Sequence, residues 1–189
     1  MKKSISIKTL VILMAAVLVL GVVAGGTFAY LKKTTSVVTN TFTKGGGIDL
    51  SLYEHKWTGS GLNNGVIVYD NSYSIVPGNT YAKDPTVEIN TNGMECYLFI
   101  KVEASATLAS CITYQIADGW TLLSGNVYYR TVTASSTLRY PVLKNNQFSV
   151  ANTVTETALD ALGSNSALKF TAYSIQKADL TPAAAYAQF

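Results

Sequence analysis

The sequence is short of charged residues and of the side chains that bind metals. Only 13% of its 189 residues are Asp, Glu, Lys or Arg, and no basic cluster with interleaved aromatic residues occurs, which argues against a nucleic-acid partner. There is one histidine, and the two cysteines are far apart. Zinc sites combine several such ligands at short spacing, and HExxH, Cys-x-x-Cys and His-x-x-x-His patterns are all missing. We therefore expect neither a metal site nor a cofactor.

The longest apolar run lies at the N-terminus. Lys2, Lys3 and Lys8 precede an apolar stretch at residues 10–23, and Thr27 and Ala29 form a small-residue cleavage pattern. This order is typical of a secretory signal peptide, so residues 1–29 are predicted to be removed during export. The mature chain would then begin at Tyr30.

The alternative is that this segment is retained in the membrane. Residues 9–31 carry no charge, and a helix of that length is long enough to cross a bilayer. Cleavage after Ala29 would remove three lysines and no acidic residue, leaving eleven basic against eleven acidic side chains. A neutral mature protein favours self-association, and its contact with the membrane would be limited to the precursor.

The remainder of the chain has a β-sheet composition, rich in Val, Thr, Tyr and Ile. The strongest strand pattern places Cys96, Leu98, Ile100 and Val102 on one inward face. Many short strands separated by turn residues predict a mainly β domain at 47–189, an antiparallel jelly-roll-like β-sandwich. The predicted strands are residues 48–53, 66–69, 73–76, 86–89, 96–103, 112–117, 120–123, 127–133, 138–143, 147–150 and 168–176.

Three further signals refine this architecture. Pro141 cannot donate a ladder hydrogen bond, so its strand is expected at a sheet edge or a bulge. Thr155 is predicted to cap a short helix that ends near Gly163, and Thr181 to cap a second one over residues 183–189. Both helices are too short to be stable alone and are expected to pack on the outside of the sandwich.

The first residues of the mature chain form a candidate polymerisation arm. Residues 30–43 have high β propensity and are followed by a glycine hinge, so the arm and hinge together span residues 30–46. The arm could pair with its own sheet, giving a monomer, or complete a second copy's open edge, giving a head-to-tail filament. An ordinary first strand or a linker is the alternative. The residues assigned to this function are Tyr30, Leu31, Val37, Val38 and Phe42 in the arm and Gly45, Gly46 and Gly47 in the hinge.

The other candidate residues are interpreted as structural or solvent-exposed residues. Cys96 and Cys111 could form a disulfide in an exported protein, but a core of this size does not need one, and each could be a small buried hydrophobic residue. His55 is interpreted as an exposed loop residue rather than a catalytic one. The acidic side chains in strand patterns, Glu88, Glu95 and Glu103, are interpreted as solvated or cross-strand partners.

Several motifs follow one another in order: GGTFAYL at the export boundary, TFTKGGGIDLSLYE, VPGNTYAKDPTVEI, ECYLFIKVEA, ADGWTLL, VYYR and LKFTAYSIQ. Together, over nearly the whole chain, they resemble the TasA/camelysin family of exported bacterial proteins, in particular members with SipW-dependent signal peptides. The resemblance implies a jelly-roll domain, cleavage at the pattern of Thr27 and Ala29 by the signal peptidase SipW, and secretion to the cell surface or biofilm matrix. It also implies fibres in which residues 30–43 of one subunit insert into the next.

We therefore expect a secreted structural protein rather than an enzyme. Its main partner would be itself, with the signal peptidase acting during export and an accessory matrix protein as a further candidate. Two alternatives stay open. Camelysin-type members have been assigned metalloprotease activity, although this sequence lacks a zinc-protease motif. A non-polymerising surface module could instead adhere to a partner through exposed aromatic residues such as Trp57 and Trp120.

Overall fold

The computed structural model describes residues 32–35, 47–134, 136–163 and 165–189, which belong to the unit Leu31–Phe189. None of the helices in these ranges is long and apolar enough to span a membrane. The predicted signal peptide and most of the predicted arm lie outside the described residues. This applies to Thr27, Ala29, Tyr30, Leu31, Val37, Val38, Phe42, Gly45 and Gly46.

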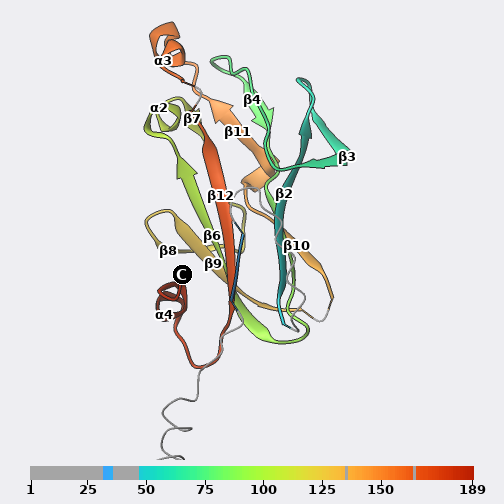
Figure 1. Cartoon of the computed structure of the whole chain (residues 1–189). Helices are drawn as coiled ribbons and strands as arrows, with labels where there is room; N and C mark the ends of the chain where they lie inside the picture. Colours follow the sequence, from blue (N-terminus) through green and yellow to red (C-terminus); the bar gives the residue numbers. More distant parts are fainter. Residues whose placement is uncertain (1–31, 36–46, 135, 164) are drawn as a thin grey trace, which may run out of the picture. The chain divides into compact units, whose positions relative to one another are not determined.

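The described unit is mainly β, with antiparallel sheets, as predicted. Two larger sheets pack face to face and a smaller sheet lies at one end (Figure 1). The first sheet has the order β1 (Lys32–Thr35), β12 (Leu168–Gln176), β6 (Glu95–Ala104), β9 (Val127–Thr133) and β8 (Thr121–Ser124). The second has the order β10 (Leu138–Pro141), β5 (Thr86–Asn90), β2 (Asp49–Trp57) and β3 (Leu62–Val68). The third contains β4 (Thr80–Ala82), β11 (Gln147–Val150) and β7 (Ile112–Thr113).

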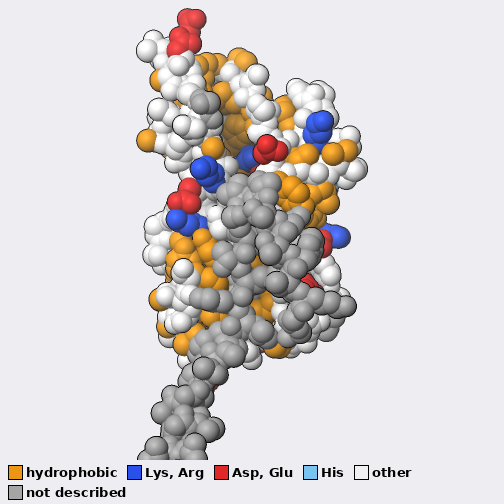
Figure 2. Space-filling model, in the orientation of Figure 1, with side chains coloured by type: hydrophobic (Ala, Val, Ile, Leu, Met, Phe, Trp, Pro, Cys, Tyr) orange, Lys and Arg blue, Asp and Glu red, His pale blue; other side chains and the backbone are white. Residues whose placement is uncertain are grey.

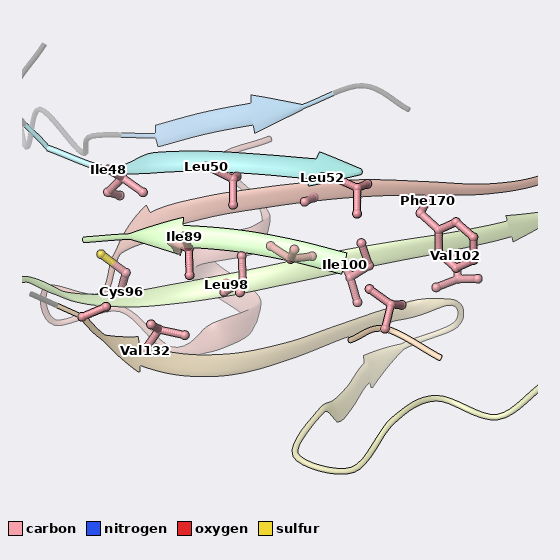
Figure 3. Close-up of a cluster of buried hydrophobic side chains, with 14 of the residues drawn as sticks. Ile48, Leu50, Leu52, Ile89, Cys96, Leu98, Ile100, Val102, Val132 and Phe170 are labelled. Carbon is pink, nitrogen blue, oxygen red and sulfur yellow. The ribbon is translucent and has the colours of Figure 1, made fainter. Parts of the chain in front are cut away.

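The main core lies between the two larger sheets. Alternate residues of β2, Leu50 and Leu52, meet the inward residues of β6 across this layer (Figure 3). The predicted inward face of β6 is confirmed, since Cys96, Leu98 and Ile100 are fully buried and Val102 nearly so. Because side chains of a strand alternate between faces, the period of two in the sequence is enough to assign this layer.

A second, smaller core lies beneath the third sheet. It contains Tyr81 of β4, Phe148 of β11 and Ile112 of β7, and the rings of Tyr81 and Phe148 stack with centroids 5.4 Å apart. Cys111 is also buried there. The short strands of the third sheet are thus held by side-chain packing as well as by their few ladder pairs.

Three short α-helices border the sheets: α2 (Ala106–Ala109), α3 (Glu156–Asp160) and α4 (Pro182–Tyr186). The two predicted caps are confirmed, because the side chains of Thr155 and Thr181 accept hydrogen bonds from the first turns of α3 and α4. Tyr186 and Phe189 cover the outer face of the first sheet, with ring centroids 5.3 Å from Phe99 and 5.0 Å from Tyr173 respectively. Phe99 is therefore buried on the face of β6 opposite the main core.

The structure also differs from the predicted strands. Residues 73–76 form no strand, and the predicted strand 112–117 is reduced to β7 followed by a single bridge between Ile116 and Leu143. Side-chain alternation alone cannot show whether a backbone partner is present. The sequence interpretation missed β4, α2 and the 3-10 turn η1 (Lys144–Asn146) because all three are short. Pro141 lies on β10 at the edge of its sheet, as predicted.

Replacing Leu98 by Ala should destabilise the fold strongly. Leu98 is fully buried in the central strand, so the truncation removes apolar contacts and leaves a cavity, at about 2–5 kcal/mol. The free energy of unfolding in denaturant measures this loss. The same truncation at Leu122 of β8, whose side chain is exposed, is the matched control and should have a much smaller effect. Equal losses for both variants would contradict the assigned core.

Candidate functional site

The outer edge of β12 is where the predicted arm meets the sandwich. One side of β12 pairs with β6, and the other side pairs with β1 from Lys32 opposite Ile175 to Thr35 opposite Ala172. These four residues are the described part of the predicted arm, and they pair within their own chain. The register stops at Ala172, so residues 168–171 of β12 have no strand partner on this side in the described part of the chain.

A cavity of about 560 Å³ adjoins this end of β12, and we call it the slot. Its lining includes residues 168–170 of β12 and the coil 69–73 with Ile75. Hydrophobic side chains on this face gather in a band over the region of β4, β11 and β12, with charged groups of both signs at its lower end (Figure 2). Leu52, Ile112 and Phe148 supply apolar lining from three different strands. The slot therefore combines an apolar interior with segments that have an unfilled strand-pairing side among the described residues.

The coil that lines the slot is the segment predicted as a strand at residues 73–76. Tyr73 and Ile75 are half-buried while Ser72 and Ser74 are exposed, so the side chains alternate as in a strand. No strand pairs with this coil among the described residues. It is held instead by tyrosine hydroxyls: Tyr73 donates to the carbonyl of Ala82 at 3.1 Å, and Tyr81 accepts from the amide of Val76 at 2.8 Å.

A buried ion pair lies on the wall of the slot. Glu54 of β2 points inward, as Leu50 and Leu52 do. Its Oε1 lies 2.8 Å from Nζ of Lys83, the residue that follows β4. Both residues are more than nine-tenths buried. Lys83 Nζ also lies 5.3 Å from the ring centroid of Tyr73 and 5.6 Å from that of Phe170. Removing two charges from water is unfavourable, so this pair must be compensated by contacts of good geometry.

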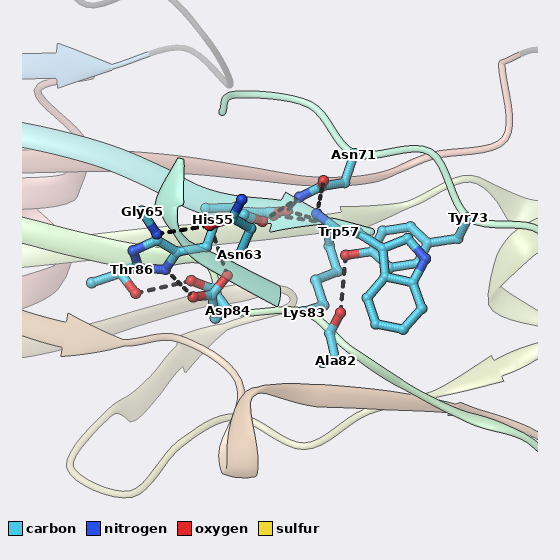
Figure 4. Close-up of polar contacts among 11 residues, drawn as sticks. His55, Trp57, Asn63, Gly65, Asn71, Tyr73, Ala82, Lys83, Asp84 and Thr86 are labelled. Atoms are coloured by element: carbon cyan, nitrogen blue, oxygen red, sulfur yellow. Dashed lines mark hydrogen bonds and ion pairs between the residues drawn. The ribbon is translucent and has the colours of Figure 1, made fainter. Parts of the chain in front are cut away.

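Asn71 completes this arrangement (Figure 4). Its Nδ2 donates to Glu54 Oε2 and to the carbonyl of His55, both at 3.0 Å, while its Oδ1 accepts from the amide of Trp57 at 2.7 Å. The cluster is shielded from water: burial raises the pKa of the Tyr73 hydroxyl, and the charges of Glu54 and Asp84 raise it further. The coil is thus attached to β2 through one side-chain amide.

His55 is a strand residue, so its interpretation as an exposed loop residue was wrong. The strand β2 extends to Trp57, and the imidazole is 22% exposed. Asp84 Oδ1 accepts from the His55 amide at 2.9 Å, and Asp84 Oδ2 lies 2.5 Å from Nδ1. A second, more open cavity of about 610 Å³ borders this pair. Within the described ranges, no group of three or more His, Cys, Asp or Glu side chains is placed to hold a metal ion.

The remaining acidic candidates form ion pairs near the surface. Glu88 pairs with Arg139 at 2.7 Å across the strands β5 and β10, as the cross-strand interpretation predicts. Glu95 pairs with Lys177 at 2.9 Å and Glu103 with Lys101 at 2.7 Å. Exposed pairs of this kind contribute little to stability and provide no reactive group.

Neither tryptophan is fully exposed, because both are half-buried and pack against other side chains. Trp57 is half-buried and stacks on Tyr73, with centroids 5.5 Å apart. Trp120 is also half-buried, donates from Nε1 to the carbonyl of Pro141 at 2.9 Å, and lies beneath the guanidinium of Arg130. Of the predicted glycine hinge, Gly47 alone is described: it is buried, and its carbonyl accepts from Asn92 Nδ2 at 2.7 Å.

The disulfide considered from the sequence is not formed. Cys96 and Cys111 are both buried free thiols, Cys96 in the main core and Cys111 in the smaller one. Burial, with a smaller contribution from the Glu95 charge, raises the pKa of Cys96 to about 11. The alternative interpretation, in which each cysteine is a small buried hydrophobic residue, agrees with this placement.

Comparisons of this chain with protein-family models, with curated proteins and with solved structures found no match.

Both thiols should be unreactive in the folded protein near neutral pH. A thiol becomes a nucleophilic thiolate only as the pH rises toward its pKa, so Cys96 should stay protonated until strongly alkaline pH, and burial blocks access to both sulfurs. Ellman titration should detect no thiol in the native state and two after unfolding in guanidinium without reductant. If unfolding also released no thiol, a disulfide would be present and the assignment would be wrong.

Proposed function

We propose that this protein is a secreted structural protein of the bacterial cell surface or biofilm matrix that assembles into fibres by exchange of its N-terminal strand. In this proposal the sandwich is a jelly-roll domain, and the arm at residues 30–43 of one copy pairs with β12 of the next. The observation that carries the proposal is the edge of β12, which accepts β1 along half its length and adjoins the slot along the rest.

The pairing of β1 with β12 supports the proposal because it identifies the edge to which the arm binds. An unpaired strand edge is a template for a further strand, from the same chain or from another. Among the described residues of one chain, β1 makes four residue pairs with β12, whereas β6 on the other side makes nine. Exchange replaces a short pairing within the chain by the same kind of backbone pairing between chains.

The slot supports the proposal by giving an incoming strand a place to continue. A strand that continued past Ala172 along the same side of β12, which we call the lane, would run beside residues 168–170. These residues line the slot together with the coil 69–73. A strand laid along this lane could form backbone hydrogen bonds with β12, about 4.8 Å away. Its alternate side chains could enter the apolar interior near Leu52 and Phe170. Donor and acceptor lie on different parts of the chain, so the contact is head to tail and generates a filament unless its rotation closes a ring.

The balance of charge and the sequence motifs agree with this proposal. Removal of residues 1–29 would leave equal numbers of basic and acidic side chains, and so little repulsion between copies. The ordered motifs resemble those of the TasA/camelysin family, and this resemblance implies that the chain is secreted and assembles into fibres.

Deleting residues 30–43 from the mature chain should abolish filaments and leave a folded monomer. The deletion removes the donor strand but none of the main-core side chains. Negative-stain microscopy and sedimentation would report assembly, and circular dichroism would report folding. A synthetic peptide of residues 30–43 should bind to this monomer. Filaments formed by the deleted protein as readily as by the mature chain would exclude the mechanism.

Filling the slot should block assembly without removing the arm. Ala167 lines the slot, so Ala167→Trp would place an indole in the lane of the incoming strand. We expect a folded protein whose filament yield falls at least about tenfold, which corresponds to a loss of roughly 1.4 kcal/mol or more in subunit affinity. The matched control is Ala161→Trp on the exposed C-cap of α3, which does not line the slot and should assemble normally. Normal assembly of both variants would show that the slot is not used.

A further inference from the structure

Three side chains on the slot wall meet in an arrangement that the fibre proposal does not use. Glu54 Oε2 accepts hydrogen bonds from Lys83 Nζ at 2.9 Å and from Asn71 Nδ2 at 3.0 Å. The three residues come from β2, from the coil after β3 and from the connection after β4. We propose that Lys83 and Asn71 become joined by an intramolecular isopeptide bond, with Glu54 as the proton carrier.

Lys83 is the nucleophile in this reaction. A lysine amine attacks a carbonyl only when it is uncharged, so Nζ must first give up a proton to a neighbouring base. Lys83 is 7% exposed, and its Nζ lies within 5.6 Å of the ring centroids of Tyr73 and Phe170. Glu54 is the carboxylate bound to its Nζ, at 2.8 Å through Oε1. Glu54 is therefore placed to accept that proton from Nζ.

Asn71 is the electrophile, and its amide is held in one orientation. The backbone N–H of Trp57 can only donate and the carbonyl of His55 can only accept, so their bonds to Asn71 identify Oδ1 and Nδ2 without ambiguity. The Trp57 amide, 2.7 Å from Oδ1, polarises the carbonyl and is placed to stabilise the negative charge that develops on this oxygen during attack. Nδ2, the leaving nitrogen, is already bonded to the proton carrier Glu54.

The reaction balances without a further reactant. The lone pair of Lys83 Nζ forms a bond to Asn71 Cγ, and the carbonyl electrons move to Oδ1. When they return, the bond between Cγ and Nδ2 breaks and its electron pair leaves on nitrogen. Glu54 carries a proton from Nζ to Nδ2, which departs as ammonia, and the second proton lost from Nζ leaves with ammonia as ammonium. Glu54 ends as the carboxylate, and nothing is oxidised or reduced.

The surroundings favour the bond and give it a structural consequence. Fixing the amine, the amide and the carboxylate in one cluster makes the step unimolecular. All three side chains line the slot, which gives ammonia a route out. The product would covalently attach the coil around Asn71, which has no strand partner in the described part of the chain, to the segment that leads from β4 into β5. The cross-link would thereby make one wall of the slot permanent.

Mass spectrometry of the full purified chain tests this inference. After the N-terminus has been determined, the intact protein should be lighter than its sequence by one ammonia molecule. Trypsin cannot cleave after an acylated lysine, so residues 57–101 should appear as one peptide carrying this mass deficit. Chymotryptic cleavage after Tyr73 and Tyr81 should leave the pieces containing Asn71 and Lys83 joined. A wild-type protein of full mass, with free peptides around Lys83, would overturn the proposal.

Variants separate the cross-link from other losses of ammonia. Glu54→Gln removes the proton carrier and Lys83→Arg the nucleophile, and each variant should have the full mass of its own sequence. Lys169→Arg changes another lysine that lines the slot and should keep the deficit. Circular dichroism would identify the variants that fold. A ring-closed succinimide at Asn64-Gly65 or Asn92-Gly93 has the same mass deficit, so a deficit that maps there, or that persists in folded Glu54→Gln, would also overturn the proposal.

Discussion

The antiparallel pairing of β6 with β12 is the interaction on which the rest of the structure depends. It runs through nine residue pairs, from Leu168 opposite Ala104 to Gln176 opposite Cys96. The inward face of β6 forms the main core with β2 and β5, and its outward face is covered by Tyr186 of α4 and by Phe189, which follows α4. Because β12 is held on one side by this long ladder, its other side is presented as a firm edge. The arm and the slot both meet that edge.

The lining of the slot is partly apolar and partly charged. Its apolar lining continues the smaller core, which suits the side chains of an added strand. Its charged wall arises because the alternation of β2 brings Glu54 inward just where the main core ends and Lys83 follows β4. Asn71 satisfies the remaining polar groups and attaches the coil. The Glu54 cluster thus holds the coil against β2 at this end of β12.

Much of the fold could be predicted from the sequence. β9 and β12 have the predicted bounds, and the inward face of β6 is correct, because long segments with alternating apolar residues are typical of strands. The bounds of the shorter β11 were also predicted correctly. Residues 73–76 show the limit of this reasoning: their side chains alternate, but whether a strand pairs with them is decided by distant parts of the chain. The short elements β4 and α2 carried too little periodicity to be recognised.

The candidate site was less predictable than the fold. Asn71 and Lys83 follow Glu54 in the sequence by 17 and 29 residues respectively, and no short motif joins the three. One signal was available, since Glu54 occupies the same phase of β2 as Leu50 and Leu52 and so had to be buried with a partner. The partner itself, like Asp84 beside His55, depends on how β4 and β5 follow each other in space. The sequence predicted an arm, and the structure shows four of its residues paired with β12 of the same chain.

The pairing of β12 with the arm of another copy is the central claim, and solid-state NMR of mixed-label filaments tests it most directly. Subunits labelled with nitrogen-15 and subunits labelled with carbon-13 would be combined before assembly, so that cross-peaks between the two labels arise only between chains. The account predicts such cross-peaks between residues of the arm and residues 168–175 of β12. Arm contacts seen only within uniformly labelled chains, or a preparation that contains isolated monomers alone, would contradict it.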